Sequence, residues 1–291
     1  MAKISRISWT NATFNGWIGC LEVSPACNEC YARTLAERYG WAKWGKDTPR
    51  HRTSVSYWNQ PYKWNAEAAK KGERLRVFSF SLADVFEDRR DLDSWRADFF
   101  KLVETTPNLD WMLLTKRADR IRALMPETWL KNPRPNVWLG VTAENQRRAD
   151  ERIPQLLSVP AAVHWISAEP LLEPVDFRRW FPGHKQDVTH DELDAPDGAV
   201  VDGQERVGNS WYRRKGIDWI IVGGESGANA RPMKKEWATD ILEQCRAGGA
   251  AYHFKQKGSV LSAEMGCKDK AGKDPAEWPP ELRVQEYPKV A

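Results

Sequence analysis

Residues 136–157 read NVWLGVTAENQRRADERIPQLL and contain the pattern from which the fold class can be predicted. The run from Val137 to Thr142 is apolar, rich in β-branched and aromatic residues, and too short for a buried helix, so it predicts a strand. The polar residues Glu144 and Asn145 follow it, and a helix-like stretch runs from Arg147 to Leu157. The stretch is therefore one strand–helix unit with polar side chains where the strand ends.

The same unit recurs along the chain. Strands are predicted at Ser8–Phe14, Val77–Ser81, Trp111–Thr115, Val163–Ser167, Trp219–Val222 and Ala251–Phe254, and further helices at Ser94–Thr105 and Lys235–Ala247. Strands that alternate with helices pair in parallel, which indicates an α/β protein. We expect a full or partial (β/α) TIM-like barrel in a single domain over residues 1–291. A doubly wound open sheet is the alternative.

Two segments depart from this rhythm. Residues 182–210 hold seven acidic and two basic residues with four glycines, and little periodicity. We interpret them as an inserted acidic loop, either a solvated surface excursion or a lid. The tail after Gly258 is polar and gives no clear signal.

Composition restricts the class of protein. The chain has 291 residues, a net charge of +4 and five cysteines. It has no apolar run long enough to span a membrane, and its start lacks the apolar core of a secretory signal. We therefore expect a soluble, cytoplasmic protein with no membrane partner. An odd number of cysteines argues against a disulfide framework and leaves metal binding or catalysis open.

Three of the cysteines cluster in GCLEVSPACNECYARTLAERYG. Cys20, Cys27 and Cys30 have the spacing C-x6-C-x2-C, between the first predicted strand and a helix. Such a loop can offer three thiolates to three irons of a [4Fe–4S] cluster and leave the fourth iron open for a ligand. A structural zinc site with His51 as a further ligand is the alternative. The remaining two, Cys245 and Cys267, are expected to be ordinary thiols.

Polar residues and glycines gather where the predicted strands end, the edge that carries chemistry in such barrels. Candidate cofactor-binding residues are Ser81, Glu144, Asn145, Glu169, Gly223, Gly224 and Glu225, and candidate substrate-binding residues are Lys116, Arg117, Lys255 and Gln256. The carboxylates and amides suit ribose hydroxyls, and the cations suit carboxylate or phosphate. Any one of them can instead belong to a structural ion pair, and the two glycines to a tight turn.

The stretch from Arg33 to Arg76 carries eleven Lys and Arg against four Asp and Glu, interleaved with tryptophans and tyrosines. Such a pattern can grip a phosphate backbone while aromatic rings stack on bases. The alternative is a pair of solvated helices whose tryptophans pack on the core.

Several long motifs resemble one family. The cysteine segment, SFSLADVF, LLTKRADRI, NVWLGVTAENQRRADERIPQLL, SAEPLLEPVD, IDWIIVGGESGANARPM and HFKQKG resemble a three-cysteine family of phage and bacterial proteins of unknown function. The resemblance spans about residues 8–258, apart from the acidic insertion. That family is similar to radical S-adenosylmethionine (SAM) enzymes and, in outline, to spore photoproduct lyase.

The resemblance implies a radical SAM barrel, a [4Fe–4S] cluster, SAM as cofactor and a cellular electron donor as partner. It favours a cluster over zinc at Cys20, Cys27 and Cys30. Gly223, Gly224 and Glu225 are similar to the GGE motif that contacts the SAM amino group, although here they follow a late strand. The chain also departs from the usual C-x3-C-x2-C spacing, and Glu29 stands where an aromatic residue usually precedes the third cysteine.

The phage setting and the basic aromatic stretch together predict a DNA or nucleotide substrate, with hypermodification of a pyrimidine as the reaction. If the chain is phage-encoded, it would act in the host cytoplasm. Two alternatives remain: a zinc-stabilised nucleic-acid-binding protein without catalysis, and a radical SAM enzyme acting on a peptide or small metabolite.

Overall fold

The computed structural model describes residues 5, 7–183, 185–186, 200–201, 204–207, 210–213 and 216–290. The chain divides into two compact units, Met1–Val141 with Pro160–Ala162, and Thr142–Val159 with Val163–Ala291. We call them the first and the second unit. No helix in the described ranges is long and apolar enough to cross a membrane.

The main sheet has seven strands in the order β1-β4-β5-β6-β7-β12-β13. Its pairs β1–β4, β4–β5, β5–β6, β7–β12 and β12–β13 are parallel. The predicted α/β class is therefore confirmed, in the partial (β/α) barrel form. A closed barrel would need its end strands to pair, and β1 and β13 are the two ends of this sheet.

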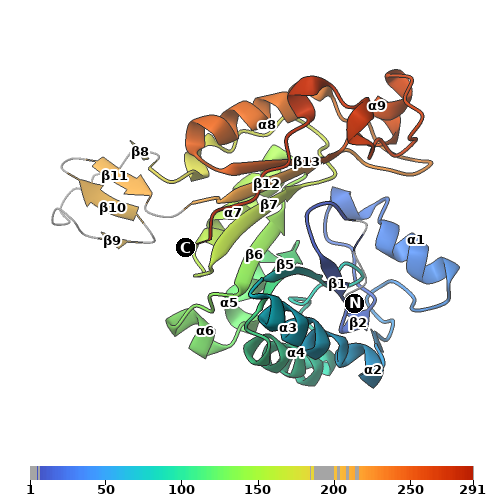
Figure 1. The fold of residues 1–291 in the computed structure, drawn as a ribbon, viewed down its shortest axis with the longest axis vertical. Coiled ribbons are helices and arrows are strands. Elements are labelled where there is room, and N and C mark those ends of the chain that lie inside the picture. The colour runs from blue at the N-terminus through green and yellow to red at the C-terminus, as the bar shows by residue number, and fades with distance from the viewer. Residues whose placement is uncertain are drawn as a thin grey trace. The chain divides into compact units, whose positions relative to one another are not determined.

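The first unit supplies the early strands and their helices (Figure 1). Its elements are β1 (Ala12–Phe14), β2 (Trp17–Ile18), η1 (Pro25–Cys27), α1 (Tyr31–Arg38), β3 (His51–Arg52), α2 (Val55–Trp58), α3 (Gln60–Lys71), β4 (Leu75–Ser79), η2 (Arg90–Leu92), α4 (Asp93–Thr105), β5 (Leu109–Thr115), α5 (Ala118–Leu124), α6 (Glu127–Lys131) and β6 (Val137–Thr142). The short strands β2 and β3 form a separate antiparallel pair.

Aromatic side chains fill the core of the first unit. The rings of Phe14 and Trp111 lie 5.6 Å apart, edge to face, and Phe99 lies 5.4 Å from Trp111. Phe80 continues the stack, 4.8 Å from Phe99 and 4.3 Å from Trp17. Edge-to-face pairs of this kind add about 0.5–1.5 kcal/mol beyond area burial. Much of the high tryptophan content is thus explained by packing.

The second unit holds the late strands. Its elements are α7 (Gln146–Leu157), β7 (Val163–Ala168), η3 (Arg178–Trp180), β12 (Trp219–Gly223), α8 (Lys235–Gly248), β13 (Ala251–Gln256), α9 (Ser259–Glu264), η5 (Pro275–Glu277) and η6 (Pro280–Leu282). Helix α8 packs on β12 and β13. After α9 the chain returns to β13, where the amide of Phe254 donates to the carbonyl of Val284 at 2.9 Å.

The acidic insertion was expected to be a loop, and that expectation is wrong for part of it. Four short strands, β8 (Lys185–Gln186), β9 (Val200–Val201), β10 (Gln204–Val207) and β11 (Ser210–Arg213), form an antiparallel sheet in the order β8-β11-β10-β9. In the hairpin, Val207 pairs with Ser210, so two residues separate the strands. The dipeptide between them is Gly-Asn, a two-residue hairpin signal that periodicity alone overlooks. The rest of the insertion lies outside the described residues.

Candidate functional site

The three clustered cysteines lie on one segment of the first unit, after β2. Cys20 follows β2 closely, Cys27 ends η1, and Cys30 is the N-cap residue directly before α1. All three are free thiols; Cys27 is buried, and Cys20 and Cys30 are half-buried. The 20–30 segment therefore presents three free thiols.

The backbone before Cys20 is held in place. Gly19 has a φ of +115°, and a Cβ atom there would lie 2.9 Å from Cδ of Arg50, so glycine is required. The Gly19 amide donates to the carbonyl of Leu82 at 3.0 Å, and the Cys20 carbonyl accepts from the Gly45 amide at 3.1 Å. The start of the cysteine segment is thus fixed by the loop that follows β4.

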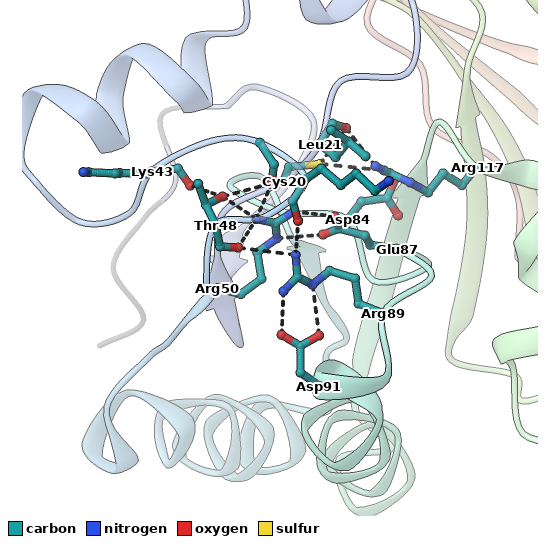
Figure 2. A network of polar contacts seen from close by, with 12 residues as sticks. Cys20, Leu21, Lys43, Thr48, Arg50, Asp84, Glu87, Arg89, Asp91 and Arg117 are labelled. Carbon is teal, nitrogen blue, oxygen red and sulfur yellow. Dashed lines mark hydrogen bonds and ion pairs between the residues drawn. The ribbon is translucent and has the colours of Figure 1, made fainter.

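Arg117 lies directly beside Cys20 (Figure 2). Its Nη1 is 3.7 Å from the Cys20 Sγ, and its Nη2 donates to the carbonyl of Leu21 at 2.7 Å. Burial is the largest influence on Cys20 and outweighs the Arg117 charge, so the pKa of the thiol rises to about 12 when no metal is bound. A metal would have to displace that proton, and Arg117 supplies the positive charge nearest to the resulting thiolate.

Asp84 holds Arg117 in this position. Its Oδ2 accepts from Arg117 Nη1 at 2.9 Å, and both side chains are buried. The same carboxylate accepts from the Thr115 hydroxyl at 2.8 Å and from the Phe86 amide at 2.9 Å. Burial alone would lower the pKa of Arg117, but Asp84, Cys20 and Glu87 raise it above its ordinary value, so the guanidinium stays charged.

A second buried ion pair lies next to the first (Figure 2). Glu87 accepts from Arg50 through both carboxylate oxygens, at 2.9 and 2.5 Å. Arg50 also donates to the carbonyl of Thr48, which Arg89 shares. Bidentate pairs of this kind combine strength with fixed geometry. The loop after β4 is therefore a rigid support for the cysteine segment.

The end of β4 carries two further features. Phe80 is a non-glycine residue with a φ of +59°, a left-handed conformation that persists only where the surroundings enforce it. Ser81 follows, and its carbonyl accepts from the Tyr31 hydroxyl at 2.9 Å, which ties α1 to this loop. The Ser81 hydroxyl accepts from the Asn15 amide group at 3.1 Å.

The first unit therefore brings Cys20, Ser81, Arg117 and the amide of Lys116 to one edge, where β1, β4 and β5 end. Sequence reasoning named these residues as site candidates and left out Glu87, Arg50 and, although it was noted after a predicted strand, Asp84. A signal for Asp84 exists, because it follows an apolar run as Glu144 does. Arg50 and Glu87 are 37 positions apart, and no local pattern connects them.

In the second unit, most candidate polar residues are engaged by neighbours. Glu144 is fully buried and pairs with Arg152 at 2.8 Å. The Asn145 side chain caps α7 by accepting from the Arg148 amide at 2.9 Å. Both positions therefore have a structural role, whatever else they do.

The remaining candidates of this unit surround the Gly-Gly-Glu turn at 223–225. Glu169 pairs with Lys255 at 2.6 Å, and Glu225 pairs with Arg231 at 2.6 Å. A Cβ on Gly224 would lie 2.2 Å from the Lys257 carbonyl oxygen, so glycine is required there by close backbone approach.

Gln256 is buried beside the turn. Its Nε2 donates to the Gly224 carbonyl at 2.8 Å. Its Oε1 is buried and, within the described part of the chain, has no hydrogen-bond partner. Leaving a buried acceptor unpaired costs about 1–3 kcal/mol, so a bound donor would be favoured at this position.

Across the described residues, no group of three or more His, Cys, Asp and Glu is placed so that it could hold a metal ion. The chemistry of the donor set is the remaining guide. Three free thiols on one segment, with a cation beside the first, are the ligands that a [4Fe–4S] cluster takes at three of its irons. A zinc site with His51 would use two or three of the same thiols.

Comparisons with known proteins complete the description. Two solved structures are similar to the chain, both variants of spore photoproduct lyase. The one with a cysteine-to-serine change is 13% identical, with a TM-score of 0.44 over 87% of this chain and 79% of its own. The one with a tyrosine-to-phenylalanine change is 12% identical, with a TM-score of 0.45 over 87% and 78%. No curated protein matches. Residues 4–278 match a family described as protein of unknown function (DUF5131), and the chain belongs to that family.

Proposed function

We propose that this protein is a radical SAM enzyme in which Cys20, Cys27 and Cys30 hold a [4Fe–4S] cluster. The observation that carries the proposal is the set of three free thiols on one segment, backed by the buried Arg117–Asp84 pair. When bound, such a cluster would supply the electron that splits SAM into methionine and a 5′-deoxyadenosyl radical, which would take hydrogen from the substrate.

The chain's own residues prepare the metal site. Arg117 would offset the negative charge of the Cys20 thiolate and, through Leu21, fixes the backbone next to it. Asp84 keeps the guanidinium in place and is itself satisfied by Thr115. These contacts are the outer-shell support that metal sites generally need.

The second unit offers groups suited to SAM. Its carboxylates at 169 and 225 suit an ammonium group or ribose hydroxyls, and the unpaired Oε1 of Gln256 would accept one hydrogen bond. Glu169 is half-buried, whereas Glu144 is fully buried, which makes Glu169 the better candidate for direct contact with SAM. A cellular electron donor would complete the reaction.

Anaerobic reconstitution tests the proposal. We expect about four irons and four sulfides per chain, and 5′-deoxyadenosine from SAM after reduction. Replacing Cys20, Cys27 or Cys30 with Ala should abolish both, whereas Cys245→Ala, the matched control, should leave both unchanged. Stoichiometric zinc without sulfide, or a reduced cluster that does not cleave SAM, would refute the assignment.

For the substrate we propose DNA or a nucleotide. The basic stretch leaves Tyr39 and Trp41 exposed and stacked, with ring centroids 5.0 Å apart and Arg38 lying 5.8 Å from the Tyr39 ring. Trp64, by contrast, is buried in the core. Exposed stacked rings beside cations suit single-stranded bases.

A binding assay tests the substrate class. Trp41→Ala should weaken binding of single-stranded DNA by about 1–3 kcal/mol, and affinity should fall steeply with salt. Tyr62→Ala, also exposed on the basic stretch, is the control and should have a smaller effect. If neither DNA nor nucleotides bind and no new nucleoside forms, the substrate is a peptide or small metabolite.

A further inference from the structure

A lysine and a cysteine that the proposed function does not use lie in contact in the second unit. Lys257, directly after β13, is fully buried. Its Nζ lies 2.5 Å from the Cys267 Sγ and donates to the Glu277 carbonyl at 2.8 Å. The amine and the sulfur are therefore in direct contact.

The loop that carries Cys267 is rigid. Its amide donates to the Ser262 carbonyl at 3.0 Å, and the next two amides, of Lys268 and Asp269, donate to the Glu277 carboxylate. Asp269 in turn accepts from the amides of Ala271, Lys273 and Asp274. The sulfur is therefore held next to the amine by its own loop.

The lysine is equally fixed. The Lys257 amide donates to the Gly272 carbonyl at 3.0 Å. A Cβ added to Gly272 would lie 2.7 Å from the Cβ of Lys257. Within the described residues, the amine contacts one sulfur and one carbonyl and forms no ion pair with a carboxylate. Cys267 is half-buried, so a small oxidant can reach the sulfur while the amine stays enclosed.

We propose that Cys267 and Lys257 form a reversible, oxidation-dependent covalent cross-link. Hydrogen peroxide oxidises the Cys267 thiol to a sulfenic acid: an S–O bond forms, the O–O bond breaks and one water leaves. In its neutral form, the Lys257 amine attacks the sulfur: an S–N bond forms, the S–O bond breaks, and the hydroxyl leaves with an amine proton as a second water. One thiol, one amine and one peroxide give one sulfenamide and two waters, with sulfur oxidised and peroxide reduced by two electrons.

The chemistry has a direct precedent in cysteine oxidation. A sulfenic acid condenses with a thiol or even with a weakly nucleophilic backbone nitrogen. A lysine amine is a better nucleophile than an amide, and here it is already in contact with the sulfur. A thiol reductant reverses the bond by attack at sulfur, as in disulfide exchange.

The cross-link would act on the Gly-Gly-Glu turn. The Lys257 carbonyl packs against Gly224, and the Glu225 carbonyl accepts from the Ser259 amide at 2.9 Å. Tying Lys257 to the 267–277 loop therefore stiffens the backbone behind this turn. The inference does not depend on a cluster or on SAM being bound.

Tryptic mapping of the full-length protein tests the cross-link. Both partners lie in residues 256–268, QKGSVLSAEMGCK, which trypsin normally cleaves after Lys257. After peroxide treatment we expect loss of this cleavage and a single peptide two hydrogen atoms lighter than its sequence. Dithiothreitol should restore the cleavage. Oxidation of Met265 in the same peptide adds oxygen that dithiothreitol does not remove, so reversal identifies the cross-link.

Two variants and a structural readout complete the test. Cys267→Ser should cleave normally after peroxide. Lys257→Arg keeps the charge and should leave a sulfenic acid that dimedone traps. In the oxidised wild type, amide exchange of the 257–277 segment should slow. Normal cleavage after Lys257 with Cys267 as sulfinic acid would overturn the proposal, and a cross-linked peptide carrying an oxygen that dithiothreitol removes would overturn the direct S–N bond.

Discussion

The two units both place an acidic residue and an arginine where parallel strands end, but the two buried pairs differ in what lies beyond them. In the first unit, Arg117 contacts Asp84 and continues to the Cys20 sulfur and the Leu21 carbonyl. In the second unit, Arg152 contacts Glu144 and the Thr142 carbonyl, which belongs to the strand itself. A buried charge at a strand end is therefore a functional signal only when its partners lead out to a reactive group.

Breaking the buried Arg152–Glu144 pair of the second unit should have the largest effect on stability. Arg152→Ala leaves the fully buried Glu144 without its charged partner, so the free energy of unfolding should fall by about 3–5 kcal/mol. Chemical denaturation followed by circular dichroism measures this. Arg147→Ala, which removes an exposed pair with Glu151, is the control and should cost under about 1 kcal/mol. A loss of less than about 1 kcal/mol for Arg152→Ala would show that the pair is not a structural element.

Changing the Arg117–Asp84 pair of the first unit should affect metal retention more than folding. Arg117→Gln keeps hydrogen-bond donors but removes the charge beside Cys20. We expect iron to leave the reconstituted protein about ten- to a hundredfold faster in the presence of a chelator, the usual size of outer-shell effects. Arg117→Lys should recover part of the loss, because it restores the charge without the bidentate reach.

The control for this experiment is Arg120→Gln, since Arg120 is half-exposed and pairs only with surface carboxylates in the described structure. Its iron release should match that of the wild type. Equal release rates for Arg117→Gln and the wild type would show that the Arg117 charge does not help to retain the metal.

The fold could be predicted from the sequence because its strands are short apolar runs between polar clusters. The β6 prediction is confirmed residue for residue, and α4 and α7 each begin one residue before their predicted starts. The β10–β11 hairpin was missed because its strands have four residues each and no continuous apolar run. Periodicity detects burial, and it fails where a strand is short and polar.

The candidate site was predictable only in part. Cysteine spacing is local and was read directly, and so was the position of Arg117 after a strand. The ion pairs of Arg117 with Asp84 and of Arg50 with Glu87 were not predicted, because tertiary packing brings together segments that are distant in the sequence. Asn145 has a structural role that the sequence also indicates, because its side chain caps α7 by accepting from the Arg148 amide, as an N-cap asparagine does.

A buried thiol also makes the stability of the folded state depend on pH in the alkaline range. In the second unit, burial, with a contribution from Glu286, raises the pKa of the Cys245 thiol above the ordinary value of 9.0. The folded state then keeps a proton that the unfolded chain loses, so the stabilisation is complete below pH 9 and declines as the pH rises through the folded-state pKa. The decline is at most about 1.4 kcal/mol per pH unit.

Cys245→Ala removes this proton linkage. The free energy of unfolding of the metal-free variant should change less between pH 9 and pH 10 than that of the wild type, by about 1 kcal/mol. Urea denaturation at the two pH values measures the difference. Identical pH dependence in both proteins would show that the thiol is not enclosed as described.

The smallest expected effect concerns the hydrogen bond that joins α1 to the loop after β4. The Tyr31 hydroxyl donates to the Ser81 carbonyl at 2.9 Å, and the tyrosine is 57% exposed, so water competes for both groups. Tyr31→Phe should therefore lower the free energy of unfolding by only about 0.5 kcal/mol, the lower end of the range for a hydrogen bond. Because Tyr31 follows Cys30 directly, release of this contact should instead appear as faster amide exchange in α1 and modestly faster iron release. Tyr39→Phe is the matched control, since it keeps the ring that stacks on Trp41 and removes only an exposed hydroxyl. If the two variants exchange at the same rate, the cysteine segment is held by Arg117 and the Gly19 backbone contacts, and the Tyr31 hydrogen bond contributes nothing measurable.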